Sequence, residues 1–161
     1  MKLRHAVLTA ALLSACSPGL DLYTPPDARD YVALCARERA LGCQAILPVL
    51  STVQGEVTVL LVNGEDEPEI TESLAGKGVS LNDFLTSVEA EEYARANIFL
   101  ASELRSGQMQ TLDGKTHTVE CRLEGGTELC RIDGGIEGFN KLEGLNGRRG
   151  SVYLMTGLLP F

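Results

Sequence analysis

His117 is the residue of this 161-residue chain best suited to acid–base chemistry, because an imidazole titrates close to neutral pH. It stands between Thr116 and Thr118 in an alternating segment, and a strand here places His117 on the face opposite both threonines. Asp113 and Glu120 are nearby carboxylates of the kind that a hydrolase uses in pairs. No nucleophile motif such as Gly-x-Ser-x-Gly accompanies them. We therefore expect no catalytic residue, and we expect His117 to be a strand residue that is either solvent-facing or hydrogen-bonded.

An acidic cluster, Glu65, Asp66, Glu67 and Glu69, follows a β-branched run. Three or more of its oxygens could bind Ca²⁺ if they converged with backbone carbonyls. The spacing is not that of an EF-hand, and charge runs usually face water. We expect a solvated acidic loop, with no metal and no cofactor.

The second half is rich in glycine, which could suggest phosphate-cradling loops, but the Lys-Ser/Thr of a P-loop is absent. Tight turns and bulges are the better interpretation. The residues are Gly134, Gly135, Gly138, Gly144, Gly147 and Gly150. The adjacent Arg148 and Arg149 could clamp an anionic glycan or a headgroup, although such a pair is more often a hairpin tip.

The first fifteen residues are typical of an export signal. Lys2 and Arg4 precede a short apolar stretch, residues 6–13, that is too short to span a bilayer. The stretch ends in Leu13-Ser14-Ala15-Cys16, which resembles the lipobox of bacterial lipoproteins. This resemblance implies cleavage before Cys16, a diacylglyceryl thioether on its sulfur and a membrane anchor. The alternative is an ordinary secretory signal with an incidental cysteine.

Residues 16–26 then form a short tether, in which Pro18 and Gly19 resist regular structure. Ser17 follows the lipidated cysteine, where Asp in Gram-negative lipoproteins favours retention at the inner membrane. Ser17 therefore predicts the outer membrane, if the organism has one, with the domain in the periplasm or at the cell surface.

The remaining four cysteines are an even set, as expected for disulfides in an oxidising compartment. Gly125-Gly126 suits a two-residue hairpin loop, and counting outward from it places Cys121 opposite Cys130 as a non-hydrogen-bonded pair within disulfide range. Elimination pairs Cys35 with Cys43. The alternatives are free buried thiols or a zinc site, although the spacings match neither of the common finger patterns.

Composition indicates one globular domain, with 44% apolar and 22% charged residues. The formal charge is −8, and it becomes −10 once residues 1–15 are removed. A nucleic-acid partner is excluded on this basis, because phosphate binding needs a positive surface.

The residue pattern predicts helices in the first part of the chain and strands in the second part, which indicates an α+β domain with an antiparallel sheet. We expect a helix from Thr24 to Leu41 that stops at Gly42, a short buried segment over 45–50 and a core strand over 56–62. A capping box at Ser80 and Asp83 starts a further helix, and another spans about Glu91 to Leu104. Strands follow Gly107, among them residues 116–119, the hairpin and a final strand over 151–155.

This order of elements resembles a single fasciclin-type domain covering residues 27–161, with its β-wedge and packed helices. The resemblance rests on four segments: Thr58–Val62, Leu81–Leu104, Thr111–Lys115, and Asn146-Gly147 with Leu158–Pro160. It implies an apolar-acidic helix after the first strand, a turn between two strands at Thr111–Lys115 and a role in adhesion.

The sequence thus predicts an envelope lipoprotein that binds an unknown protein or glycan and catalyses nothing. The alternatives are an envelope hydrolase or metal-dependent enzyme of unrecognised type, and a structural lipoprotein of envelope assembly. Phe139, Tyr153 and Phe161 could belong either to the core or to an apolar patch.

Overall fold

The computed structural model describes residues 31–145 and 148–161, and the side chains of residues 31–139 and 150–161. The predicted signal, Cys16 and the tether lie outside the described residues. The helices are α2 (Tyr31–Arg37), α3 (Leu41–Leu50), α4 (Glu67–Leu74), the 3-10 helix η2 (Leu81–Thr86) and α5 (Val88–Ala96). The strands are β1 (Val57–Val62), β2 (Ile98–Phe99), β3 (Gly107–Gln110), β4 (Thr116–Glu124), β5 (Thr127–Ile132), β6 (Ile136–Leu145) and β7 (Arg148–Met155).

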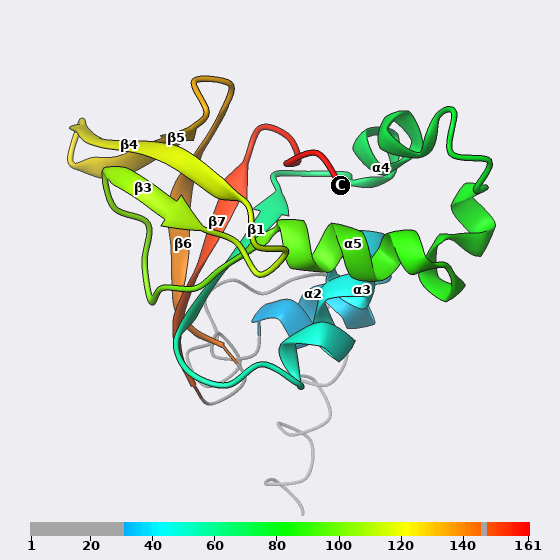
Figure 1. Cartoon of the computed structure of the whole chain (residues 1–161). Coiled ribbons are helices and arrows are strands. Elements are labelled where there is room, and N and C mark those ends of the chain that lie inside the picture. Colours follow the sequence, from blue (N-terminus) through cyan, green and yellow to red (C-terminus); the bar gives the residue numbers. More distant parts are fainter. Residues whose placement is uncertain (1–30, 146–147) are drawn as a thin grey trace, which may run out of the picture.

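The strands form one seven-stranded sheet in the order β2-β1-β7-β6-β5-β4-β3, curved into a nearly closed barrel beside the helices (Figure 1). Its two ends meet where Phe99 pairs with Thr111 and the Leu112 N–H donates to the Ile98 carbonyl at 2.8 Å. The prediction of an α+β domain with its helices in the N-terminal half is confirmed. The predicted antiparallel sheet needs one correction, because β1 pairs with β7 in parallel.

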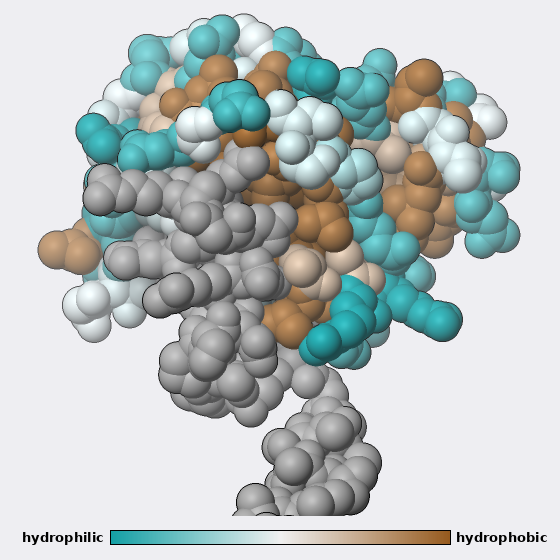
Figure 2. Space-filling view, turned by 90° about the horizontal axis from the view of Figure 1, so that it is seen from below, coloured by the Kyte–Doolittle hydropathy of each residue, from teal (hydrophilic) through white to brown (hydrophobic). Residues whose placement is uncertain are grey.

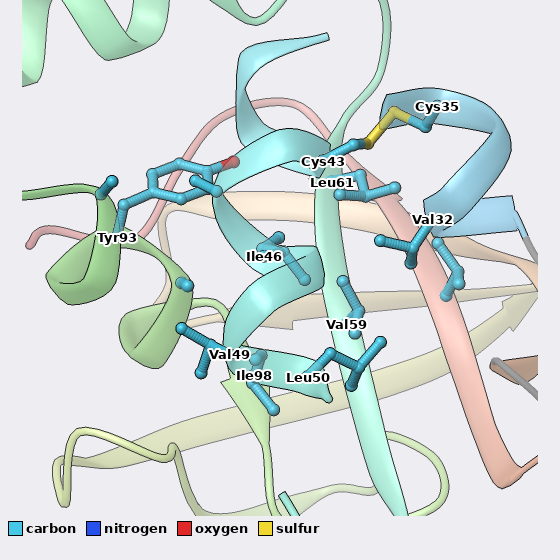
Figure 3. Packing of buried hydrophobic residues seen from close by; sticks show 14 of the residues in the cluster. Val32, Cys35, Cys43, Ile46, Val49, Leu50, Val59, Leu61, Tyr93 and Ile98 are labelled. Atoms are coloured by element: carbon cyan, nitrogen blue, oxygen red, sulfur yellow. A yellow bond between two sulfur atoms is a disulfide. The ribbon is translucent and has the colours of Figure 1, made fainter. Parts of the chain in front are cut away.

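Two hydrophobic cores share β1 and β7. Val59 and Leu61 pack with Val152 against the helices, as Figure 3 shows for the two β1 residues. The alternate residues Leu60 and Tyr153 face the other way and fill the barrel interior. Burial on both faces explains why these strands are continuous apolar runs rather than alternating ones.

The first helix differs from its prediction. α2 ends at Arg37, and Arg39 takes a positive φ of 69° before α3 begins at Leu41. Gly42, predicted as the stop, lies in the first turn of α3, where a Cβ would collide with the hydroxyl of Tyr93. The glycine serves close packing there. The buried segment predicted over 45–50 is the C-terminal half of α3.

The central helices also differ. The Ser80 hydroxyl accepts from the Asp83 N–H at 3.2 Å, so the predicted cap is present, but the element is the 3-10 helix η2. The helix expected to reach Leu104 is α5, which ends at Ala96. Ile98 and Phe99 leave the helix to pair with β1, because the sheet offers their β-branched and aromatic side chains a buried position.

The glycine hairpin has the predicted register, from Glu124 opposite Thr127 to Cys121 opposite Cys130. The structure joins Cys121 to Cys130, and Cys35 to Cys43, by disulfides, which are the two predicted pairs. The second bond links α2 to α3 and lies at the edge of the helical core (Figure 3).

Candidate functional site

A groove of about 370 Å³ lies between α3 and the segment formed by η2 and α5. Its lining is apolar at the floor and polar at the rim, which is the usual lining of a ligand site. The residues are Gln44, Ala45, Pro48, Val49, Thr52, Leu85, Ser87, Ala90, Glu91 and Arg95. Its volume also falls within the usual range for ligand pockets.

Short-range contacts fix both walls of the groove. On one side the Ser87 hydroxyl donates to the Phe84 carbonyl at 2.6 Å, and the buried Phe84 ring anchors the turn between η2 and α5. On the other, the Ser51 hydroxyl donates to the Pro48 carbonyl at 2.6 Å near the end of α3. The groove therefore stands on packed helices rather than on a loose loop.

The rim of the groove carries one ion pair, between Arg95 Nε and Glu91 Oε1 at 2.8 Å. Leu85 is 38% exposed at the groove, although it is a large apolar residue. Figure 2, seen from below, shows further hydrophobic residues reaching the surface on the helical side, bordered by hydrophilic ones. The groove thus offers apolar contact together with one charged pair.

A second arrangement surrounds His117, which β4 places inside the barrel at 7% exposure. Its Nδ1 lies 2.6 Å from Asp133 Oδ2, and its Nε2 lies 3.2 Å from the Thr111 hydroxyl. The Thr111 hydroxyl also bonds Asp113 Oδ1 at 2.5 Å. The row Asp133–His117–Thr111 has the order of an acid, base and hydroxyl nucleophile.

The Thr111 side chain has no exposed surface, so its hydroxyl is closed off from solvent. The row joins the turn before β4 to the turn after β5. Burial tends to raise the pKa of Asp133, but hydrogen bonds from His117 and the Thr118 N–H hold that pKa below its usual value. The same holds for Asp113, where the Thr111 hydroxyl and the Lys115 N–H outweigh burial and lower the pKa.

The predicted acidic loop is only partly solvated. Asp66 is 7% exposed, and its Oδ2 accepts from the Gly42 N–H at 2.5 Å. A carboxylate at a helix N-terminus is stabilised by the unpaired N–H groups there. Glu67 and Glu69 lie in the first turn of α4, where they favour that helix in the same way.

Most of the other predicted residues lie away from the groove. Glu120 is exposed on the outer face of β4, and Arg148 and Arg149 begin β7 with side chains outside the described residues. Tyr153 belongs to the barrel core, whereas Phe139 and Phe161 are half-buried against the helical core. In the described part of the chain, no helix is long and apolar enough to span a bilayer.

Sequence reasoning missed the groove and two members of the His117 row. The groove arises from the contact of α3 with α5, which are distant in sequence and carry no motif. Asp133 had a usable signal, since an Asp before Gly134-Gly135 at a strand end suits the positive φ of 51° that it adopts. Thr111 could be found only through the closure of the barrel.

Comparison with known proteins adds no assignment to these sites, since no protein-family model matches the chain and no curated protein matches it either.

Proposed function

We propose that this chain is a lipid-anchored protein of the cell envelope whose domain binds a partner protein and catalyses no reaction. The lipobox ending in Cys16 supports the anchor, and Ser17 supports the outer membrane where the organism has one. The even set of paired cysteines agrees with an oxidising compartment.

The groove between α3 and α5 carries the binding proposal. Its floor and its exposed Leu85 fit an apolar side chain of a partner, and its polar rim fits the backbone around that side chain. The walls are held by packed helices, so little ordering free energy is lost when a partner binds.

The net negative charge of the helices beside the groove indicates which kind of partner binds there. Residues 65–95, which include α4, η2 and α5, hold nine acidic side chains, all but the buried Asp66 at the surface, against two basic ones. This surface attracts cations and repels anions, so it favours a basic protein segment over an acidic glycan. We infer that the partner presents lysine or arginine around an apolar anchor residue.

The fasciclin-like relationship belongs to the same proposal. The turn at Thr111–Lys115 between β3 and β4, and the acidic helix α4 after β1, agree with what the resemblance implies. Adhesion modules of this kind act by contact, which is the role that we assign to the groove.

The anchor is tested by Cys16→Ser, which removes the thiol that takes the diacylglyceryl group. We expect the variant to lose palmitate labelling and to leave the membrane fraction or stay unprocessed. Palmitate incorporation into the variant at the wild-type level would overturn the anchor.

The groove is tested with the full lipidated chain in detergent micelles and a fluorescent peptide that carries lysines around a central leucine. We expect Leu85→Arg to weaken binding by about tenfold or more, which corresponds to about 1.4 kcal/mol. Leu100→Arg is the matched control, because Leu100 is 48% exposed, lies outside the groove and gains the same charge.

Two results would contradict the groove proposal. One is equal binding by the Leu85→Arg and wild-type proteins. The other is equal affinity for the lysine peptide and for a peptide in which glutamate replaces each lysine.

The hydrolase alternative is tested through the His117 row. If His117 were the base of a hydrolase, His117→Ala would lower the rate on a panel of ester and amide substrates by about two to four orders of magnitude. We expect no turnover by either protein. Because His117 is buried with two partners, we also expect the variant to lose about 1–3 kcal/mol of stability.

A further inference from the structure

One end of the barrel gathers two sulfurs and a carboxylate. Cys121 on β4 faces Cys130 on β5, with Cα atoms 4.1 Å apart. Glu128 stands two residues before Cys130, so its side chain lies on the same face of the strand. The Sγ atoms and a Glu128 carboxylate oxygen all lie within 4.8 Å of one another.

We propose that, once the Cys121–Cys130 disulfide is reduced, Cys121, Cys130 and Glu128 bind one thiophilic divalent cation, with Zn²⁺ as the best match. Two thiolates and a carboxylate are ligands that Zn²⁺ takes, and three protein ligands leave a fourth position for water. This site is separate from the groove and does not depend on the function proposed above.

The spacing agrees with tetrahedral coordination. Zn–S bonds of about 2.3 Å and Zn–O bonds of about 2.1 Å place a bound sulfur and oxygen about 3.6 Å apart. Cys130 Sγ already lies 3.7 Å from Glu128 Oε1. Breaking the S–S bond lets the two sulfurs move to the separation of about 3.8 Å that two such bonds require.

The surroundings orient the carboxylate and admit the ion. The Tyr153 hydroxyl donates to Glu128 Oε1 at 2.8 Å, in the manner of the outer partners that fix metal-bound carboxylates. Cys130 is fully buried, whereas Cys121 is half-buried and Glu128 is exposed, which leaves a path from solvent.

The redox step balances with a dithiol as reductant. The dithiol supplies two electrons and two protons, the Cys121–Cys130 S–S bond breaks, two thiols form and the dithiol becomes its own disulfide. Zn²⁺ then binds as the two thiols release their protons. Exchange with the disulfide of an oxidised dithiol reverses the step: that disulfide takes the two electrons and becomes a dithiol, the Cys121–Cys130 bond forms again and the ion is released.

The experiment uses the full chain with Cys16→Ser, which removes the one cysteine outside the two pairs. The protein is reduced with a phosphine without oxygen, freed of reductant and titrated with Co²⁺ as a spectroscopic probe. We expect one equivalent to produce thiolate-to-cobalt absorption with tetrahedral bands, and Zn²⁺ to displace it. The oxidised protein should produce neither.

Variants separate the ligands from the fold. Glu128→Gln should weaken binding by at least about tenfold, and Tyr153→Phe by about 10–100-fold as an outer partner. Glu120→Gln is the matched control, because Glu120 adjoins Cys121 but is exposed on the opposite face of β4. Circular dichroism checks that each variant is folded.

The rate of cysteine alkylation in the reduced chain, with and without Zn²⁺, tests the ligands without further variants. We expect Zn²⁺ to slow the labelling of Cys121 and Cys130 by about tenfold or more and to leave Cys35 and Cys43 unchanged. Equal protection of all four cysteines, a cobalt spectrum without thiolate absorption, or full affinity in Glu128→Gln would each overturn the site.

Discussion

At the scale of single residues, one very close contact lies where α3 meets α5. The Tyr93 hydroxyl is fully buried and has no hydrogen-bond partner among the described residues, and it lies against Gly42 and near Asp66. Burial, with the charge of Asp66 adding to it, raises the pKa of Tyr93. Substitutions at Gly42 and Tyr93 should therefore have non-additive effects on stability, because the two residues are in close steric contact.

We predict that Gly42→Ala destabilises the protein by about 1–3 kcal/mol, because the new Cβ has no room beside the Tyr93 hydroxyl and lies 3.0 Å from Asp66 Oδ2. Tyr93→Phe removes an unpaired buried hydroxyl, so it should be neutral or stabilising. The double variant should recover part of the loss in urea unfolding. Additive effects of the two substitutions would contradict the coupling.

A second residue-scale prediction concerns acid stability. The pKa of Asp133 is lower in the folded state, so its stabilisation is complete above the unfolded value of about 3.9 and disappears as pH falls through the lowered folded value. Asp133→Asn should reduce stability at neutral pH and flatten its decline below about pH 4. The effect is modest, because the Asp133 side chain is 49% exposed.

The measurement is urea unfolding of both proteins between neutral and acidic pH. Asparagine tolerates the positive φ at this position, so the backbone should be undisturbed. Glu120→Gln serves as the exposed control on the same sheet. The prediction would be refuted if the free energy of unfolding fell equally steeply with pH below about pH 4 in Asp133→Asn and in wild type.

At the scale of elements, β6 is a strand that the sequence pattern does not predict. Its pairing with β7 shifts register between Asn140 and Leu142, and again between Glu143 and Leu145. Such irregularities break the alternation by which strands are recognised. Gly138 allows the two strands to approach, because a Cβ there would meet the Leu154 carbonyl and the Met155 sulfur.

We predict that Gly138→Ala costs about 3 kcal/mol or more, since backbone and a core side chain would both have to move. Gly135→Ala is the matched control, because its nearest neighbour is the Ile132 carbonyl oxygen at 3.9 Å. Thermal unfolding compares the two. A Gly138→Ala protein as stable as Gly135→Ala would show that β6 can shift away from β7.

Local chemistry explains which elements could be predicted. The glycine loop fixes the register of β4 with β5, and the β-branched run fixes β1, because each signal lies within its own segment. The sequence predicts helix for Ile98 and Phe99, because only β1, which is distant in sequence, makes them a strand. The sequence predicts a solvated Asp66 for the same reason, since its partner Gly42 belongs to another element.

At the scale of the whole molecule, the two cores should behave as one cooperative unit, because β1 and β7 contribute to both. Leu60→Ala removes a side chain from the barrel interior and should cost about 2–5 kcal/mol. We expect hydrogen exchange to accelerate equally in α3 and in β4, as in a single unfolding transition.

The control is Leu123→Ala at the hairpin tip, where Leu123 is 78% exposed and the change should stay within about 0.5 kcal/mol. Faster exchange confined to β4 in the Leu60→Ala protein would show instead that the barrel opens without the helical core.

The parallel pairing of β1 with β7 also determines when the protein can fold. Val57 finds its partner in Gly150, and Val62 finds its partner in Met155, so the central contact of the sheet joins an early segment to one of the last. Long-range pairing of this kind slows folding, because a large loop must close before the contact forms. Chains truncated before residue 148 should remain unfolded and open to proteolysis, and the complete chain should fold late and in one step.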